Sequence, residues 1–143
     1  SDPPTPVKFV CRPVMETVAT YSSILSAIDD PECVIVDNRS RDEFTGADRR
    51  ALHGGAIPTA KHRDWEDLYD SESGCMKDAD QLREAFETLE ALPDKEITLY
   101  CNTGYRSAHA YLALRLLNYP RIRNYVGSWQ EWGNRSGLPI WKP

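Results

Sequence analysis

The sequence contains no long apolar run and no continuous stretch of basic residues. Its apolar segments fall far short of the about 20 residues that cross a membrane. The 143 residues carry 17 Lys and Arg against 22 Asp and Glu, and the short arginine clusters are interrupted by acidic or apolar residues. Such a chain offers no basic surface for nucleic acid. We expect a soluble protein, cytoplasmic or periplasmic, with no nucleic-acid or membrane partner.

The cysteines lack the spacing of a zinc site. Cys11, Cys33, Cys75 and Cys101 lie far apart, and a domain of this length does not need disulfide bridges. We therefore predict four free thiols, no metal ion and no cofactor. Cys33 begins an apolar segment and is expected in the core.

Cys101 alone opens a loop between a predicted strand, 97–100, and a predicted helix, 108–117. Gly104 can adopt the left-handed conformation that turns this loop. Backbone N–H groups then converge before the positive end of the helix dipole. We expect Cys101 to be a nucleophilic thiolate near neutral pH.

The remaining pattern alternates short apolar strands with helices. Thr20, Ser40, Asp78 and Ser128 are expected to cap helices or turns. Residues 1–13 contain four prolines and are predicted to be an extended arm or linker before one domain, 14–143. The alternation indicates an α/β sandwich around a mainly parallel sheet. Predicted strands are 14–18, 33–36, 97–100 and 124–127; predicted helices and turns are 21–29, 41–44, 65–69, 79–89, 108–117 and 129–133.

Asp37 also follows a predicted strand, so it should lie near Cys101 if the two strands are neighbours. For Asp37 and Arg39 we favour loop anchoring through hydrogen bonds over direct chemistry.

Four segments carry motifs in a characteristic order: VIVDNRSRDEFTG at 34–46, GAIPTA at 55–60, CNTGYRS at 101–107 and YVGSWQEW at 125–132. Together they resemble the rhodanese family of sulfurtransferases, and the last resembles the catalytic half of tandem-domain members. The resemblance implies three layers, with a five-stranded parallel sheet flanked by helices. It also implies that a catalytically silent rhodanese-like domain precedes residue 1 in the natural protein.

The family's reaction, carried over by this resemblance, moves sulfane sulfur. Cys101 would attack a donor such as thiosulfate, release sulfite and pass the sulfur to a thiol or cyanide. Backbone N–H groups would bind the sulfur and the donor's charge; the loop residues are Asn102, Thr103, Gly104, Tyr105, Arg106 and Ser107.

Several side chains have two interpretations each. Arg106 either binds the anionic donor or pairs with a carboxylate, and Ser107 either caps the helix or also contacts the sulfur. Trp129 and Trp132 either line the pocket or pack in the core. Tyr105 is expected to be exposed and to control access of the acceptor. The segment 61–63 could add positive potential.

The chain departs from thiosulfate-specialised members at two positions. Thr103 and Glu43 stand where those members carry basic residues, so we expect weak activity with thiosulfate. A non-enzymatic binding or persulfide-relay module is the main alternative. A cysteine phosphatase is disfavoured, because that loop places five residues between cysteine and arginine, and here only four separate Cys101 from Arg106.

Overall fold

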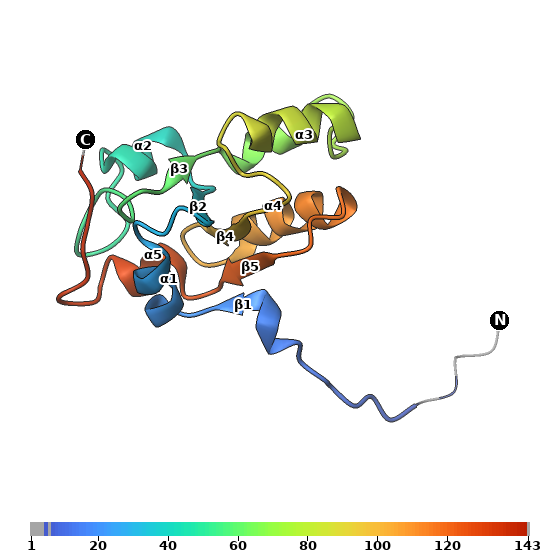
Figure 1. The fold of residues 1–143 in the computed structure, drawn as a ribbon, viewed down its shortest axis with the longest axis horizontal. Coiled ribbons are helices and arrows are strands. Elements are labelled where there is room, and N and C mark those ends of the chain that lie inside the picture. The colour runs from blue at the N-terminus through green and yellow to red at the C-terminus, as the bar shows by residue number, and fades with distance from the viewer. Residues whose placement is uncertain (1–4, 6, 143) are drawn as a thin grey trace.

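A computed structural model describes residue 5 and residues 7–142 (Figure 1). Its centre is a parallel sheet with strand order β1-β5-β4-β2-β3. The strands are β1 (Val18–Ala19), β2 (Cys33–Asp37), β3 (Lys61–His62), β4 (Glu96–Tyr100) and β5 (Ile122–Tyr125). The predicted five-stranded parallel sheet is confirmed.

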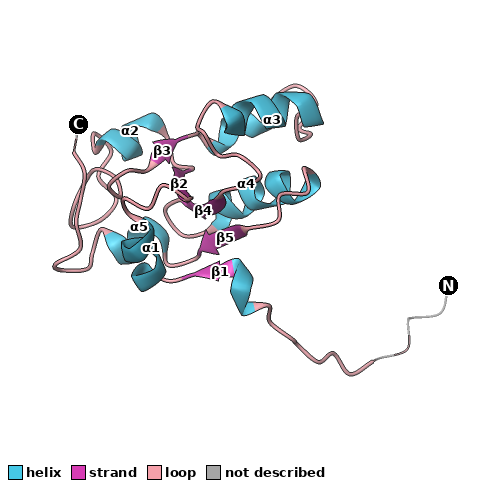
Figure 2. Ribbon diagram, viewed as in Figure 1, coloured by secondary structure: helices cyan, strands magenta, loops and turns pink. Residues whose placement is uncertain are grey.

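Helices cover both faces of the sheet, as the three-layer expectation requires (Figure 2). They are α1 (Tyr21–Ala27), α2 (Arg41–Thr45), α3 (Ala79–Glu87), α4 (Tyr105–Leu116) and α5 (Ser128–Trp132), with short 3-10 helices η1 (Met15–Thr17) and η2 (Trp65–Leu68). Successive strand residues point to opposite faces. Val36 and Leu99 therefore pack with α3 and α4, whereas Ile35 and Tyr100 pack with α1 and α5.

Three predicted helix caps are confirmed. The side chains of Thr20, Ser40 and Asp78 each accept a hydrogen bond from the backbone N–H three residues on, and each forms a reciprocal capping box. These side chains satisfy backbone donors that the first helical turn leaves unpaired. Each helix therefore starts where its sequence signal places it.

Helix α4 begins at Tyr105, three residues before the predicted start. Gly104, at φ +89°, ends the loop in the left-handed conformation and stands at the N-cap. Tyr105, Arg106 and Ser107 therefore belong to the first helical turn, not to the loop. Tyr105 and Ser107 have lower helix propensity than the Ala- and Leu-rich segment that follows, so the sequence signal for a helix starts late. Burial of Ser107 accompanies the extra turn.

Two strand predictions were wrong in extent. Residues 14–18 do not form a strand: η1 occupies most of the segment, and only β1 pairs with β5. Strand β5 spans Ile122–Tyr125, whereas the sequence predicted a strand over 124–127. The observed strand therefore starts and ends two residues earlier. Strand β3 was missed because its two residues, Lys61 and His62, are polar and show no apolar pattern.

Ser128 does not cap a turn. It is the first residue of α5 and adopts φ +51°, and its hydroxyl donates to the carbonyl of Tyr125 at 2.7 Å. The hydroxyl oxygen also accepts a hydrogen bond from the backbone N–H of Cys101 at 3.2 Å. Ser128 therefore ties the end of β5 to the start of the cysteine loop.

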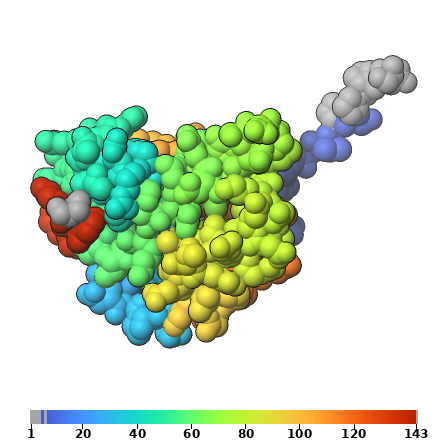
Figure 3. Space-filling view, turned by 90° about the horizontal axis from the view of Figure 1, so that it is seen from above, coloured from blue at the N-terminus to red at the C-terminus, as the bar shows by residue number. Residues whose placement is uncertain are grey.

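Residues 7–13 contain no helix or strand, and their side chains are exposed. They lead away from the folded body (Figures 1 and 3). The other residues of the predicted arm, except residue 5, lie outside the described residues. Within the described part of the chain, no helix is long and apolar enough to cross a membrane.

Candidate active site

Cys101 follows β4 directly, beside the end of β2. Asp37 pairs in register with Tyr100, and the backbone N–H of Asn38 donates to the carbonyl of Tyr100 at 2.8 Å. The Cys101 side chain is fully buried, and the backbone N–H of Gly104 donates to its Sγ at 3.1 Å. The cysteine thus sits in the concave turn between β4 and α4, at the carboxyl edge of the sheet.

Hydrogen-bond donors around the sulfur favour the thiolate. Burial by itself would raise the pKa of Cys101, but the Ser107 hydroxyl and the backbone N–H groups of Ser107, Thr103 and Gly104 oppose it. The balance lowers the pKa of Cys101 below its ordinary value. The N-terminal end of α4 adds its dipole in the same direction. The thiol is therefore suited to nucleophilic attack.

The Ser107 hydroxyl is shared among three acceptors. Its Oγ lies 2.7 Å from Asn124 Oδ1, 3.1 Å from the carbonyl of Gly104 and 3.6 Å from Cys101 Sγ. A hydroxyl carries one proton, so it donates to only one of these at a time. The backbone N–H of Gly104 is therefore a more constant hydrogen-bond donor to the sulfur than the Ser107 hydroxyl is.

The loop is held from behind by β5 and α5. The Asn124 amide donates to the carbonyl of Gly104 at 3.2 Å. The backbone N–H groups of Trp129 and Gln130 donate to the carbonyls of Cys101 and Asn102, both at 3.0 Å. Asn124 was not recognised as part of the site from the sequence, because it stands on a separate strand with no motif of its own.

Arg106 forms a two-point ion pair with Glu43 of α2. Its Nη1 lies 2.6 Å from Oε2 and its Nη2 lies 2.9 Å from Oε1. The Glu43 side chain is 3% exposed and also accepts from the backbone N–H of Ser40. Of the two roles considered for Arg106, the structure shows pairing with a carboxylate.

The ion pair shifts the pKa of both partners. Burial by itself would raise the pKa of Glu43, but Arg106 and Ser40 outweigh it and lower the pKa to about 2. Glu43 in turn raises the pKa of Arg106, to which the nearby Cys101 thiolate also contributes. Both terminal nitrogens of the guanidinium donate to the Glu43 carboxylate.

Asp37 and Arg39 form a second, fully buried ion pair beneath the loops. Arg39 Nη2 lies 2.6 Å from Asp37 Oδ2 and donates to the carbonyl of Gly55 at 2.7 Å. The Arg39 guanidinium stacks over the ring of Trp129, 4.3 Å from its centroid. These contacts join the loop after β2 to the loop at Gly55 and to α5, and neither side chain has a hydrogen bond to Cys101 among the described residues.

Trp129 and Trp132 are fully buried and belong to the core on the α1 and α5 face. Their indole N–H groups donate to the carbonyls of His53 and Pro139. The two side chains pack in the core, which was the second of the two roles considered for them. Tyr105 is 82% exposed, so it is free to contact an approaching molecule.

The cations of segment 61–63 have partners of their own. Lys61 pairs with Glu90, and Arg63 pairs with Asp67. His62 Nε2 lies 2.8 Å from the carbonyl of Arg39. These side chains contact groups outside the cysteine loop, and their addition of positive potential there stays a prediction.

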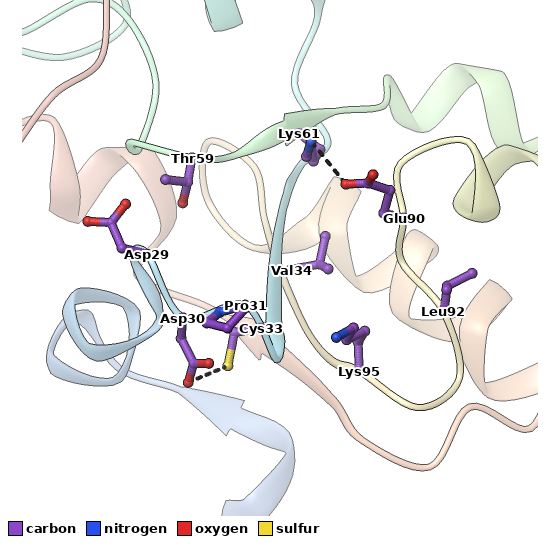
Figure 4. Close-up of a pocket in the computed structure, with 10 residues that line it drawn as sticks. All are labelled: Asp29, Asp30, Pro31, Cys33, Val34, Thr59, Lys61, Glu90, Leu92 and Lys95. Atoms are coloured by element: carbon purple, nitrogen blue, oxygen red, sulfur yellow. Dashed lines mark hydrogen bonds and ion pairs between the residues drawn. The ribbon is translucent and has the colours of Figure 1, made fainter.

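The other cysteines have different surroundings. Cys33 lies at the start of β2 in a cavity of about 500 Å³ whose lining includes Asp29, Lys61 and Lys95 (Figure 4). Burial and the nearby Asp30 raise the pKa of Cys33 to about 11, which makes it a poor nucleophile. Cys11 and Cys75 are exposed. The described residues contain no cluster of His, Cys, Asp and Glu side chains that could hold a metal ion.

Comparisons with known proteins agree with this geometry. The family described as "Rhodanese-like domain" matches residues 20–135. The chain is 40% identical over 117 residues to the sulfur carrier protein TtuD of Thermus thermophilus, covering 76% of this chain and 41% of that protein. It is 35% identical over 125 residues to the thiosulfate sulfurtransferase of Azotobacter vinelandii, covering 87% of this chain and 46% of that enzyme.

Solved structures show the same fold. The anaerobic ergothioneine biosynthesis enzyme from Chlorobium limicola superimposes with a TM-score of 0.82 at 21% identity, covering 89% of this chain and 32% of that one. At this identity the likeness concerns the fold alone. The chain spans somewhat less than half the length of the curated relatives named above.

Proposed function

The chain belongs to the rhodanese-like family, and from this premise we propose that it transfers sulfane sulfur through a persulfide on Cys101. One observation carries the proposal: a buried thiol of lowered pKa faces the backbone N–H of Gly104 at the start of α4. The binding site around it consists of the loop residues Asn102, Thr103 and Gly104 and the first-turn residues Tyr105, Arg106 and Ser107. Asp37, Arg39, Trp129 and Trp132 support that loop from below.

In the first half-reaction the Cys101 thiolate attacks the outer sulfur of a donor such as thiosulfate. A bond forms between Sγ and that sulfur, the donor's S–S bond breaks, and sulfite leaves with the electron pair. No general base is needed, because the thiolate exists before the donor arrives. Backbone N–H groups of the loop stabilise the negative charge on the transferred sulfur.

In the second half-reaction an acceptor attacks the terminal sulfur of the persulfide. Cyanide gives thiocyanate, and a thiolate gives a new persulfide; in both cases Cys101 leaves as a thiolate. The hydrogen-bond donors that lower the pKa of Cys101 also make its thiolate a good leaving group. One loop therefore serves both half-reactions.

We place this activity in one domain, residues 14–143, with residues 1–13 as an arm or linker. The relatives named above are about twice as long as this chain. We propose that a second rhodanese-like domain precedes residue 1 in the natural protein. The physiological donor and acceptor are small molecules or protein thiols that reach the exposed Tyr105 side of the loop.

A persulfide carrier is the second candidate function. The observation that favours it is the 40% identity to a protein named as a sulfur carrier. A carrier is loaded at Cys101 but passes its sulfur to a protein partner. A phosphatase is disfavoured, because Arg106 follows Cys101 after only four residues and its terminal nitrogens are bound to Glu43.

Turnover measurements separate these functions. We expect the protein to convert thiosulfate and cyanide to sulfite and thiocyanate, and Cys101→Ser to abolish the conversion. Cys33→Ser is the matched control and should retain the activity, because Cys33 lies at the opposite end of the sheet. Loading of Cys101 with stoichiometric release of thiocyanate but no sustained turnover would indicate a carrier. Equal activity of Cys101→Ser would refute both functions.

A further inference from the structure

The ion pair between Glu43 and Arg106 lies beside the sulfur that would be loaded. Arg106 stands on the first turn of α4, which follows the cysteine loop, and it is the one Lys or Arg within residues 101–107. Both terminal nitrogens of the guanidinium are bound to Glu43, at 2.6 and 2.9 Å. The carboxylate of Glu43 therefore occupies the edge that the two terminal nitrogens of Arg106 form, and it neutralises the charge of the guanidinium.

Within the cysteine loop and the first turn of α4, Arg106 is the one cationic side chain, and Glu43 neutralises it. A dianion therefore approaches the Cys101 thiolate with no net positive side-chain charge from residues 101–107 to offset the repulsion. A donor with less charge pays a smaller electrostatic penalty on approach.

We propose that Glu43 sets the donor specificity of this site: by holding Arg106, it favours sulfane-sulfur donors with at most one negative charge over dianionic thiosulfate. The inference rests on the proposed function and names its donor class. Glu43 acts through Arg106, so it is a specificity-determining residue that does not itself touch the reacting atoms.

The favoured donors react without extra components. An organic persulfide, R–S–SH, is attacked at its terminal sulfur; the Sγ–S bond forms, the donor's S–S bond breaks, and R–S⁻ leaves with the electron pair. Methanethiosulfonate, CH3–SO2–S⁻, is attacked at its outer sulfur and releases methanesulfinate. It carries the same kind of sulfane sulfur as thiosulfate with one charge fewer, which makes the two a matched pair of probes.

The test compares kcat/KM for thiosulfate and for methanethiosulfonate in the wild type and in Glu43→Gln. Glutamine keeps the shape and the hydrogen bond to Ser40 but removes the charge. We expect the ratio of thiosulfate to methanethiosulfonate to rise about tenfold in the variant, equivalent to about 1.4 kcal/mol. A merely structural role would lower both values together and leave the ratio unchanged.

Glu32→Gln is the matched control. Glu32 also pairs with a cation, Lys95 at 2.8 Å, but lies before β2, at the opposite end of the strand from Asp37. The Glu32→Gln variant removes the same charge from the protein. Its ratio of kcat/KM for thiosulfate to kcat/KM for methanethiosulfonate should equal that of the wild type. Glu43→Asp keeps the charge and should also keep the wild-type ratio.

The outcomes separate the two claims. If the wild type forms no persulfide with either donor, the proposed function fails, and this inference fails with it. If the wild type is loaded but Glu43→Gln leaves the ratio unchanged, only the inference is overturned. Should Glu43→Gln not fold, the salt dependence of the wild type decides. Added salt should raise kcat/KM for thiosulfate more than for methanethiosulfonate, and equal responses would refute the inference.

Discussion

The hydroxyl of Tyr100 donates a 2.6 Å hydrogen bond to the carboxylate of Asp37, across the two central strands of the sheet. Both side chains are fully buried, and Tyr100 immediately precedes Cys101. The same hydroxyl oxygen accepts a hydrogen bond from the backbone N–H of Ile57 at 3.2 Å. One contact thus links the cysteine loop to the buried Asp37–Arg39 ion pair.

Tyr100→Phe should destabilise the protein by about 1–3 kcal/mol, because it leaves the buried backbone N–H of Ile57 without its partner and removes one donor to the Asp37 carboxylate. Urea denaturation of the wild type and the variant measures the difference. Tyr111→Phe, on the partly exposed part of α4, is the control and should change stability little. Equal stability of Tyr100→Phe and the wild type would show that the buried contact contributes nothing.

Ser107→Ala should raise the pKa of Cys101, because it removes one of the hydrogen-bond donors that stabilise the thiolate. The fraction of thiolate at neutral pH then falls. The pKa follows from the ultraviolet absorbance of the thiolate against pH, with Cys101→Ser subtracted to remove the other cysteines. Ser26→Ala, on α1, is the control. An unchanged pKa would mean that backbone N–H groups alone stabilise the thiolate.

Gly104→Ala should impair both folding and sulfur loading. Residue 104 has φ +89°, and an added Cβ would lie 3.1 Å from the carbonyl oxygen of Val126. Gly74→Ala is a matched control, because Gly74 also has a positive φ (+68°) but an added Cβ meets nothing within 4 Å. Gly74→Ala should cost about 1 kcal/mol from backbone strain and leave loading intact.

For Gly104→Ala we expect a larger loss of stability than for Gly74→Ala, together with slower persulfide formation, because the N–H of residue 104 contacts Sγ. Thermal unfolding and the rate of persulfide formation measure the two effects. Equal effects of the two substitutions would show that crowding against Val126 has no role in shaping the loop.

The Glu43–Arg106 pair should make stability depend on pH in the acid range. The pKa of Glu43 is lowered from 4.5 to about 2 by folding, so its contribution is present above about pH 4.5 and is lost as the pH falls towards 2. The free energy of unfolding of the wild type should exceed that of Glu43→Gln by about 1–3 kcal/mol at pH 6. This difference in stability should shrink by pH 3. A difference that does not vary with pH would contradict this assignment.

Much of the fold was predictable because its signals are local. The apolar run before Asp37 reads as a buried strand, and Thr20, Ser40 and Asp78 mark helix starts by a side chain that reaches three residues ahead. The cysteine loop was equally predictable, since a strand, Cys101 and Gly104 follow one another in the sequence. Structure that depends on residues close together in the chain can be predicted from local sequence patterns.

What could not be predicted depends on contacts between distant segments. Asn124 supports the loop from β5, and Ser128 binds the N–H of Cys101 from α5, but neither contact leaves a local pattern. The pairing of Arg106 with Glu43 joins residues 63 positions apart. Strand β3 exists only because β2 offers a partner, since its own two residues carry no strand signal.

The mass of the intact protein after exposure to a sulfur donor tests the central claim most directly. The wild type, treated with methanethiosulfonate or thiosulfate, should gain the mass of one sulfur atom. Cyanide should remove the gain, and peptide mapping should place it on Cys101. Cys33→Ser should behave as the wild type and Cys101→Ser should gain nothing. A wild type that gains no mass with either donor, or gains it at another cysteine, would contradict persulfide transfer through Cys101.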